Sequence, residues 1–275
     1  MNKDFVVFDQ ELCIGCSKCV YDCLPRVIEL VDGKAQFKYK ERCMKCGHCG
    51  AICPVDAVEY HDDTYEVLII DYDKDTYHIE PDRLEAFIRM KRSCRQYLTK
   101  PVEDLKLDKI INMGQISPTG GNRQPLNFVV VKSEEKLEDL RKITMETLGD
   151  IGKTMEGRYA DVFQNMKQLY EETGYDRLFY KAPVLVVIHG DPQQSPSYMV
   201  DGGIAAGQMT LVAESLGLGS CYIGFLKTAV EHNDKIKEFL KIPSHHHVIT
   251  NLILGYPDVS YYRGVPRLKN TIQYL

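Results

Sequence analysis

Two short runs of cysteines with the same spacing constrain this chain more than any other feature of its sequence. The first run, CIGCSKCVYDC, spans residues 13–23, and the second, CMKCGHCGAIC, spans residues 43–53. Both follow the pattern C-x2-C-x2-C-x3-C, and together they hold eight of the ten cysteines. The eight are Cys13, Cys16, Cys19, Cys23, Cys43, Cys46, Cys49 and Cys53. Thiols this close together serve as disulfide partners, zinc ligands or iron ligands.

The rest of the sequence argues against disulfides. The N-terminal segment 1–13 has no apolar run of signal-peptide length, and the longest apolar runs, such as 182–188, are strand-sized. No window approaches the roughly 20 apolar residues of a membrane helix. We therefore expect a cytoplasmic protein with no membrane partner, and disulfides are rare in the cytoplasm. The net charge of −5 likewise gives no reason to expect nucleic acid as a partner.

The spacing of the cysteines favours an iron–sulfur cluster over zinc. Zinc sites usually combine two separated C-x2-C pairs, because four ligands must surround one ion tetrahedrally. Three cysteines at successive three-residue steps suit a cubane, since a short loop can then place one thiolate on each of three irons. The fourth ligand must come from elsewhere in the chain. Zinc remains the alternative at this point.

Residues 1–62 resemble a bacterial two-cluster ferredoxin, in which this run is the cluster-binding motif. An apolar stretch follows each run, PRVIEL after the first and PVDAVEY after the second. The resemblance implies two [4Fe–4S] clusters with crossed ligation, in which Cys23 and Cys53 each serve the cluster held mainly by the other run. In one departure, Pro25 follows its run one residue later than Pro54 does, but no ligand is lost.

A charged connector is expected over residues 63–85. Residues 62–85 contain nine acidic and two basic side chains, and TYEVLII at 64–70 is typical of a strand. Pro81 is expected in the first turn of a helix. The acidic stretch therefore predicts a boundary between the cysteine-rich part and the C-terminal part of the chain.

In the C-terminal part, residues 86–275, helical and strand-like segments alternate. This pattern predicts a layered α+β or α/β domain with its own core. We expect residues 145–178, which are polar and helical in pattern, to form a mobile cover. Helices are expected over 84–97, 104–116 and 202–219, and the last would be closed by Gly217 and Gly219. Strands are expected over 127–132, 182–189 and 245–257, and the last would end in a turn.

The stretch KRSCRQY at 91–97 is the first candidate for binding chemistry. It groups Lys91, Arg92 and Arg95 around Ser93, and guanidinium groups match phosphate oxygens well. A solvated basic helix end would explain the same residues. No nucleophile elbow, phosphate-binding P-loop or H-E-x-x-H motif occurs, and the glycines of 202–207 lie inside a helical pattern, which argues against a dinucleotide site.

A second stretch, SPTGGNRQPLNFVVV at 117–131, favours a ligand site. Its glycines let the backbone approach a ligand closely, and the amides of Asn122 and Gln124 can pair with a polar ring edge. Together the two stretches are similar to the openings of the FMN-dependent nitroreductase family, R-R-S-x-R-x-[YF] and A-P-[ST]-G-G-N-x-Q-P-W. Residues 201–224 resemble its central helix and flavin-facing turn, and 254–268 its closing segment.

This second resemblance runs from about residue 81 to residue 275 and implies an α+β sandwich, an FMN cofactor and a homodimer with the flavin between subunits. Leu126 departs from the family, which often has an aromatic residue there. In this resemblance Lys91, Arg92, Ser93 and Arg95 would hold the phosphate and ribityl end, with Arg267 as a further phosphate contact. Pro118, Thr119, Asn122 and Gln124 would line the ring or ribityl chain, and the N–H of Gly224 would approach flavin N5 beside Ile223.

Other conspicuous residues have simpler interpretations. Three consecutive histidines, 245–247, cannot all face one metal from a strand, so we expect a turn at a strand edge there. Cys94 and Cys221 are expected to be packed thiols. His48 is expected at the surface or beside the second cluster.

Joining the two parts in one chain suggests the function. Clusters pass single electrons and a flavin accepts one or two, so the first hypothesis is an iron–sulfur flavoprotein oxidoreductase. It would take electrons from reduced ferredoxin or NAD(P)H and reduce a small nitro, quinone or ene-type acceptor. The second hypothesis is an electron-transfer module that relays electrons to a partner protein. The third is a zinc-binding protein without redox chemistry, which a colourless purified protein would favour.

Overall fold

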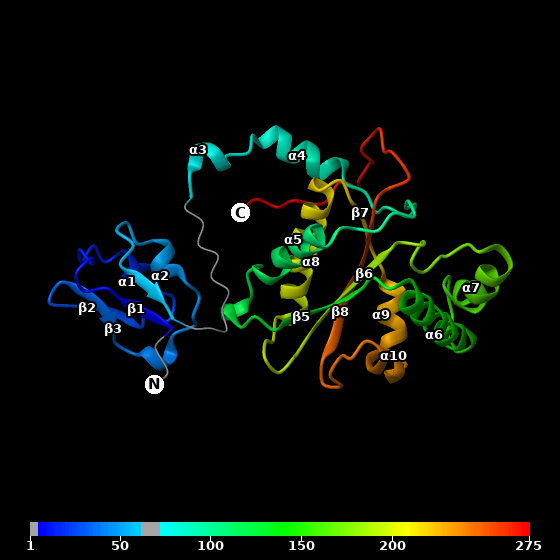
Figure 1. Ribbon diagram of the computed structural model, residues 1–275, viewed down its shortest axis with the longest axis horizontal. Coiled ribbons are helices and arrows are strands. Elements are labelled where there is room, and N and C mark those ends of the chain that lie inside the picture. The colour runs from blue at the N-terminus through cyan, green and yellow to red at the C-terminus, as the bar shows by residue number, and fades with distance from the viewer. Residues whose placement is uncertain (1–4, 62–71) are drawn as a thin grey trace. The chain divides into compact units, whose positions relative to one another are not determined.

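The computed structural model describes residues 5–61 and 72–275, and the chain divides into two compact units. The first unit comprises residues 1–78 with 121–123, and the second comprises 79–120 with 124–275. Figure 1 traces the elements of each unit along the chain. The strand expected at 64–70 lies outside the described residues.

Two short antiparallel pairs of strands form the frame of the first unit. Strand β1 (Val6–Phe8) pairs with β4 (Val58–Tyr60), which joins the two ends of the cysteine-rich segment. Strand β2 (Ile28–Val31) pairs with β3 (Lys34–Phe37) across a two-residue turn. That turn is Asp32–Gly33, with φ of 50° and 75°, the conformation for which an Asp-Gly pair is suited.

The two cysteine runs have the same backbone conformation as well as the same spacing. Each run enters a short helix, α1 (Lys18–Asp22) or α2 (His48–Ala51). A 3-10 turn, η1 (Lys40–Arg42), precedes the second run, and α3 (Lys74–Tyr77) ends the unit. Left-handed residues recur thirty positions apart, at 15 and 45, at 17 and 47, and at 26 and 56. The internal repeat of the sequence is therefore also a structural repeat.

A small core holds the first unit together. Val6 and Val58 from the β1–β4 pair pack with Ile28 and Ala35 from the β2–β3 pair, and all four are buried. The cysteines border this core, with Cys13 itself buried. The apolar stretches that come after the two runs thus supply the core, and the runs themselves lie at its edge.

A four-stranded antiparallel sheet forms the centre of the second unit. Its strand order is β5 (Leu126–Val131), β6 (Val184–Gly190), β8 (His247–Gly255) and β7 (Gly219–Tyr222). All seven residues of β6 are buried. A strand buried on both faces must be apolar throughout, and the run PVLVVI meets that requirement.

Helices cover both faces of this sheet. The buried side chains of β6 alternate between two core clusters, with Leu185 and Val187 in one and Val186 and Ile188 in the other. The first cluster is closed by α6 (Glu134–Thr154), α7 (Ala160–Thr173), α9 (Gly224–Val230) and α10 (Asp234–Phe239), and the second by α5 (Asp104–Gln115) and α8 (Tyr198–Ser215). The α+β fold class expected from the sequence is confirmed.

Most elements expected from the sequence are present, with three corrections. The first helix is α4 (Pro81–Met90), which begins at the expected proline but ends before the basic stretch. Helix α8 ends at Ser215, and Gly217, which has φ 75°, follows its C-terminal cap, whereas Gly219 already belongs to β7. The expected cover contributes to the core, because Met145 of α6 and Met166 of α7 are buried.

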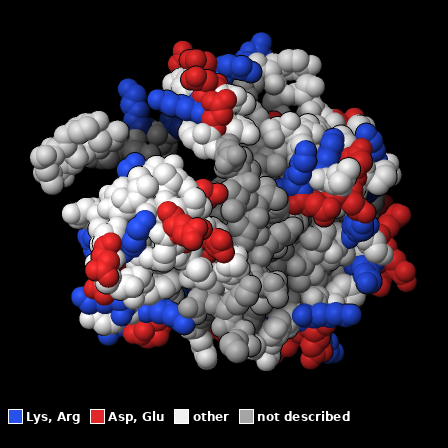
Figure 2. All heavy atoms as spheres, turned by 60° about the vertical axis from the view of Figure 1, so that its left-hand side comes forward, with Lys and Arg blue, Asp and Glu red and all other residues white. Residues whose placement is uncertain are grey.

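The surface matches the modest net charge. On the face drawn in Figure 2, acidic and basic side chains of described residues are interspersed. Within residues 5–61 and 72–275, no helix is both long and apolar enough to cross a membrane.

Candidate cluster and cofactor sites

Each hollow of the first unit combines three cysteines of one run with the fourth cysteine of the other. The first hollow encloses about 360 Å³ of space that is partly open to solvent. Its lining includes Cys13, Cys16, Cys19 and Cys53. The second hollow has a similar volume, about 360 Å³, and its lining includes Cys23, Cys43, Cys46 and Cys49. The structure thus brings together the two crossed ligand sets expected from the sequence.

The short helices explain why the fourth cysteines change partners. Cys23 is the C-terminal cap of α1, and Cys53 follows the C-terminal cap of α2. The third cysteine of each run, Cys19 or Cys49, is the second residue of its helix, and the helix carries the chain away from this point before the fourth cysteine. Four thiolates around each hollow suit a cubane cluster, whose irons need four separate ligands.

Backbone N–H groups point at several of these sulfurs. The N–H groups of Ala35 and Ala57 donate to Cys13 Sγ and Cys53 Sγ, both at 3.3 Å, at the first hollow. At the second, the N–H of Lys45 donates to Cys43 Sγ at 3.4 Å. Hydrogen bonds to ligand sulfurs stabilise their negative charge and raise the reduction potential of a cluster.

The environment of three of these thiols disfavours their ionised form. Burial, together with the nearby Cys43 and Cys46 thiolates, raises the pKa of Cys49 to about 12. Burial also raises the pKa values of Cys19 and Cys43. A coordinating metal deprotonates thiols outright, so iron would supply the charge that these sites otherwise lack. The donors, their grouping and their electrostatics therefore fit iron–sulfur clusters.

The loops around the second hollow are tightly packed. The hydroxyl of Tyr60 donates to the carbonyl of Gly47 at 2.7 Å, and a Cβ added at Gly50 would lie 2.1 Å from the same hydroxyl. In the first loop, a Cβ at Gly15 would lie 2.1 Å from the carbonyl oxygen of Gly33. His48 is exposed, as expected, and its Nδ1 lies 3.0 Å from Asp22 Oδ2.

The basic stretch of the second unit is an extended segment beside β7. Ser93 pairs with Ser220 in a parallel bridge, and the N–H of Cys94 donates to the Ser220 carbonyl at 2.9 Å. Farther along, the N–H of Leu98 donates to the carbonyl of Tyr256 at 2.9 Å. This pairing with strand β7 and with the segment after β8 satisfies the backbone groups of the stretch, so the helix can stop at Met90.

The approach of this segment to β7 requires a glycine. A Cβ at Gly219 would lie 2.6 Å from Cys94 Cβ and 2.8 Å from its sulfur. Cys94 is buried, as expected of a packed thiol, and Cys221 is buried as well. The hydroxyl oxygen of Ser220 is buried without a hydrogen-bond partner, so a polar group of a ligand would satisfy it.

Arg92 lines a hollow between the segment and β7. The other lining residues include Met90, Glu214, Pro257 and Tyr261, and the Tyr261 hydroxyl donates to the Ser93 carbonyl at 3.3 Å. Burial lowers the pKa of Lys91, whereas the nearby Glu214 carboxylate raises it. Burial also raises the pKa of Glu214. An added anion would stabilise the half-buried Lys91 ammonium. The group of Lys91, Arg92, Ser93 and Arg95, called the basic cradle below, therefore fits a phosphate.

Arg95 lies beside an aromatic ring. Its guanidinium carbon lies 5.9 Å from the centre of the Tyr180 ring. Tyr180 and Lys181 have left-handed backbones, with φ of 53° and 57°. The buried Asp176 carboxylate holds this strained loop by accepting hydrogen bonds from the N–H groups of Phe179 and Lys181, both at 2.9 Å.

The glycine-rich loop is fixed by α8 at one end. The N–H of Gly120 donates to Asp201 Oδ1 at 3.1 Å, and the N–H of Gln124 donates to the Thr119 hydroxyl at 3.0 Å. Pro118 is exposed and precedes Thr119. Asn122, which belongs to the first unit, and Gln124, which belongs to the second, both have left-handed backbones. Such backbones cost energy in residues other than glycine and cluster at functional sites.

The expected donor to the flavin lies at the start of α9. Gly224 is the first residue of that helix and is exposed, and a Cβ there would meet nothing within 4 Å. The first N–H groups of a helix have no partner within it, so this one can serve a ligand. Ile223 is buried beside it, and the Asn251 amide donates to the Ile223 carbonyl at 3.2 Å.

Arg267 was also expected to bind the phosphate, but no described contact links it to the basic cradle. It lies in the exposed C-terminal segment 258–275, beyond the last strand. Conversely, Tyr180, Glu214 and Tyr261 surround the cradle but were not predicted. No local pattern marks them, because they come from α8 and from the segments before β6 and after β8, which lie far from residues 91–95 in the sequence.

Comparisons with known proteins agree with this division of the chain. Residues 88–256 match the family model described as nitroreductase family, and residues 5–54 match the one described as 4Fe-4S dicluster domain. The first match spans the second unit from α4 to the end of β8, and the second spans both cysteine runs.

Individual proteins resemble the chain at moderate identity. A putative NADH dehydrogenase/NAD(P)H nitroreductase of Methanothermobacter thermautotrophicus is 28% identical over 194 residues, which cover 67% of this chain and 84% of the relative. A protein of Archaeoglobus fulgidus with the same description is 25% identical over 174 residues, covering 62% and 83%. A Desulfitobacterium hafniense nitroreductase with bound FMN has a solved structure that is 26% identical, with a TM-score of 0.58, covering 72% of this chain and all of that one.

Proposed function

The chain belongs to the nitroreductase family of FMN-dependent oxidoreductases, and we propose that two [4Fe–4S] clusters in its first unit exchange electrons with the FMN. One observation carries this proposal. A single chain holds eight cysteines around two hollows and, farther along, a basic cradle on a nitroreductase fold. Each part alone is a known kind of cofactor site, and their fusion gives each a redox partner.

The proposed clusters have crossed ligands. One would be held by Cys13, Cys16, Cys19 and Cys53, and the other by Cys23, Cys43, Cys46 and Cys49. The lining of the two hollows supports this assignment, since each contains one of these sets. The N–H groups directed at Cys13 and Cys53 support it further, because they would offset the negative charge of the first cluster.

The proposed FMN site uses the residues expected from the family resemblance. Lys91, Arg92, Ser93 and Arg95 would hold the phosphate and the ribityl end, and Arg267 would add a contact from the C-terminal segment. Pro118, Thr119, Asn122 and Gln124 would line the flavin, with Ile223 and the N–H of Gly224 near its N5. The bound FMN of the Desulfitobacterium hafniense structure supports the choice of cofactor.

When bound, the FMN would supply transfer of one or two electrons and the clusters transfer of single electrons. The side chains of this chain would bind and orient these groups. Arg95, whose guanidinium lies beside the Tyr180 ring, would present this group to the phosphate. Ile223 and the loop before β5 would exclude water from the flavin.

The proposed partners are small molecules and a second copy of the chain. A nitro, quinone or ene-type compound would be the acceptor, and NAD(P)H or a ferredoxin-type protein would be the donor. The description of the two archaeal relatives as NAD(P)H nitroreductases supports the nicotinamide donor and the nitro acceptor. The family resemblance supports a homodimer, and the proposed location is the cytoplasm, as expected from the sequence.

Anaerobic purification followed by a screen of donors and acceptors tests this proposal. We expect iron, sulfide and FMN in the purified protein, together with catalytic reduction of at least one nitro or quinone compound. A colourless protein that contains zinc in place of iron, or a flavin-loaded protein inactive with every donor and acceptor, would contradict it.

A further inference from the structure

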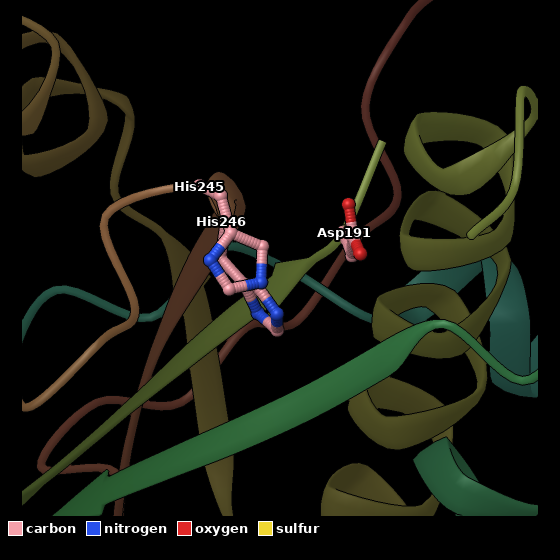
Figure 3. A group of neighbouring side chains, drawn as sticks. All are labelled: Asp191, His245 and His246. Atoms are coloured by element: carbon pink, nitrogen blue, oxygen red, sulfur yellow. The ribbon is translucent and has the colours of Figure 1, made fainter. Parts of the chain in front are cut away.

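Two histidines and an aspartate come together at one edge of the central sheet. Strands β6 and β8 are antiparallel neighbours, and their register pairs Gly190 with His247. Asp191 directly follows β6 and His246 directly precedes β8, so this pairing brings the two residues to the same end of the sheet. One ligand-type atom from each of Asp191, His245 and His246 lies within 4.8 Å of the others. Figure 3 shows the two imidazoles side by side, with Asp191 at the end of the neighbouring strand.

We infer that Asp191, His245 and His246 bind a divalent first-row transition metal ion such as Zn²⁺. Imidazole nitrogens together with one carboxylate oxygen are a common ligand set for such ions. Three protein ligands would leave room in a tetrahedral geometry for one water molecule. Coordination would join the end of β6 to the start of β8.

The local backbone permits two adjacent histidines to serve one ion. His245 and His246 precede β8, and the N–H of His246 closes a turn on the carbonyl of Pro243 at 3.0 Å. The strict alternation of side chains along a strand therefore does not separate them. The third histidine, His247, is in the strand, and its Nδ1 lies 2.9 Å from the hydroxyl of Tyr198.

A buried histidine, His189, contacts one of the proposed ligands, His246. His189 is 5% exposed, and its Nδ1 lies 2.9 Å from Nδ1 of His246. Histidines that bind metals usually have their second ring nitrogen held by a hydrogen bond, which fixes the ring. The strand register shifts between Ile188 and His189, at the end of β6 where this contact lies.

Equilibrium dialysis of the purified protein, with its clusters and flavin in place, against Zn²⁺ tests the inference. We expect one zinc ion per chain by elemental analysis, with no loss of iron. His245→Asn and Asp191→Asn should each weaken zinc binding at least about 10-fold, because even loss of an outer-shell partner costs that much. Both positions are exposed or half-buried, so both variants should fold. His247→Asn, a neighbour outside the site, should bind zinc like the wild type.

Two results would overturn the inference. One is a wild-type protein that takes up no zinc while retaining its iron. The other is equal zinc affinity in the wild type, Asp191→Asn and His245→Asn, which would assign any bound zinc to other surface groups. This measurement does not depend on the proposed electron transfer, since zinc uptake is measured directly and not through activity.

Discussion

Cys53 and Cys13 line the same hollow, although forty residues separate them in the sequence. The second hollow likewise joins Cys23 to Cys43. Each fourth cysteine is therefore placed with the three leading cysteines of the other run. If clusters occupy these hollows, each is held by both halves of the repeat, and assembling either cluster requires both halves to fold.

Paired substitutions test the crossed ligation. The variant Cys16→Ala with Cys53→Ala removes two ligands from one proposed cluster, so it should keep about half of the wild-type iron if clusters are independent. The variant Cys46→Ala with Cys53→Ala removes one ligand from each cluster and should lose most of the iron. Iron and sulfide contents after anaerobic purification measure both.

The reverse order of iron contents would assign each cluster to its own run. The matched control is Cys94→Ala, since that buried thiol belongs to the second unit and should leave the iron content unchanged. A loss of iron in this control would show that the iron content reports general instability.

The identity of the flavin is a second prediction. A cradle with Lys91, Arg92 and Arg95 around one serine suits a terminal phosphate, and we expect FMN. Acid release of the flavin followed by chromatography identifies the species. Recovery of FAD as the main flavin would contradict the assignment of these residues to a terminal phosphate.

Arg95→Ala should weaken FMN binding by about 10- to 100-fold, because a hydrogen bond to a charged group contributes about 1.5–3 kcal/mol. Titration of flavin-free protein, followed by flavin fluorescence, measures the affinity. Arg89→Ala is the control, since Arg89 lies on α4 and pairs with Glu85 at 2.5 Å. Equal affinities in the two variants would remove Arg95 from the site.

Gly219→Ala should destabilise the second unit, because the new Cβ would lie 2.6 Å from Cys94 Cβ. Overpacking of this kind costs about 1–3 kcal/mol, and displacement of the 93–95 segment should also weaken FMN binding. Chemical denaturation and flavin titration measure the two effects. Gly264→Ala, where nothing lies within 4 Å of an added Cβ, should change neither. An undisturbed Gly219→Ala protein would mean that the segment has room to move.

Much of the second unit could be predicted from local patterns. Strand β6 and helix α5 occur where their apolar patterns predict them. Burial on both faces makes the sequence of β6 apolar throughout its centre, and burial on one face gives α5 its helical spacing of apolar residues. The predicted C-terminal end of the first helix was wrong. Arg92 and Arg95 continue the helical pattern in the sequence, but α4 ends at Met90. There the pairing of Ser93 with Ser220 overrides local preference, and no local signal reveals a partner so far along the chain.

The candidate sites show the same limit. Cysteine spacing singled out the eight candidate ligands of the first unit, because a cluster needs thiols at fixed steps, and the resemblance to ferredoxins supplied their crossed grouping. In the second unit, the cradle could be recognised from its cations, whereas Tyr180 beside Arg95 could not. The cluster of Asp191 with His246 was also missed, because its members meet only through the register of β6 and β8.

The central claim is that the clusters and the FMN exchange electrons within one protein. Because one chain carries both units, the connector expected over residues 63–85 would limit their separation, and the resulting high effective concentration would favour this exchange. Two variants isolate the step: the full-length Cys16→Ala with Cys46→Ala, and a truncated chain that lacks residues 1–62. Both should retain FMN, because the basic cradle lies beyond residue 90.

Rapid-mixing measurement of flavin reduction, with a ferredoxin-type donor and separately with NAD(P)H, tests this claim most directly. We predict that both variants slow reduction by the ferredoxin-type donor at least about 10-fold, since the intramolecular route is lost. Direct reduction by NAD(P)H should change much less. Equal rates in the wild type and both variants with every donor would contradict the claim, and the first unit would then need another role.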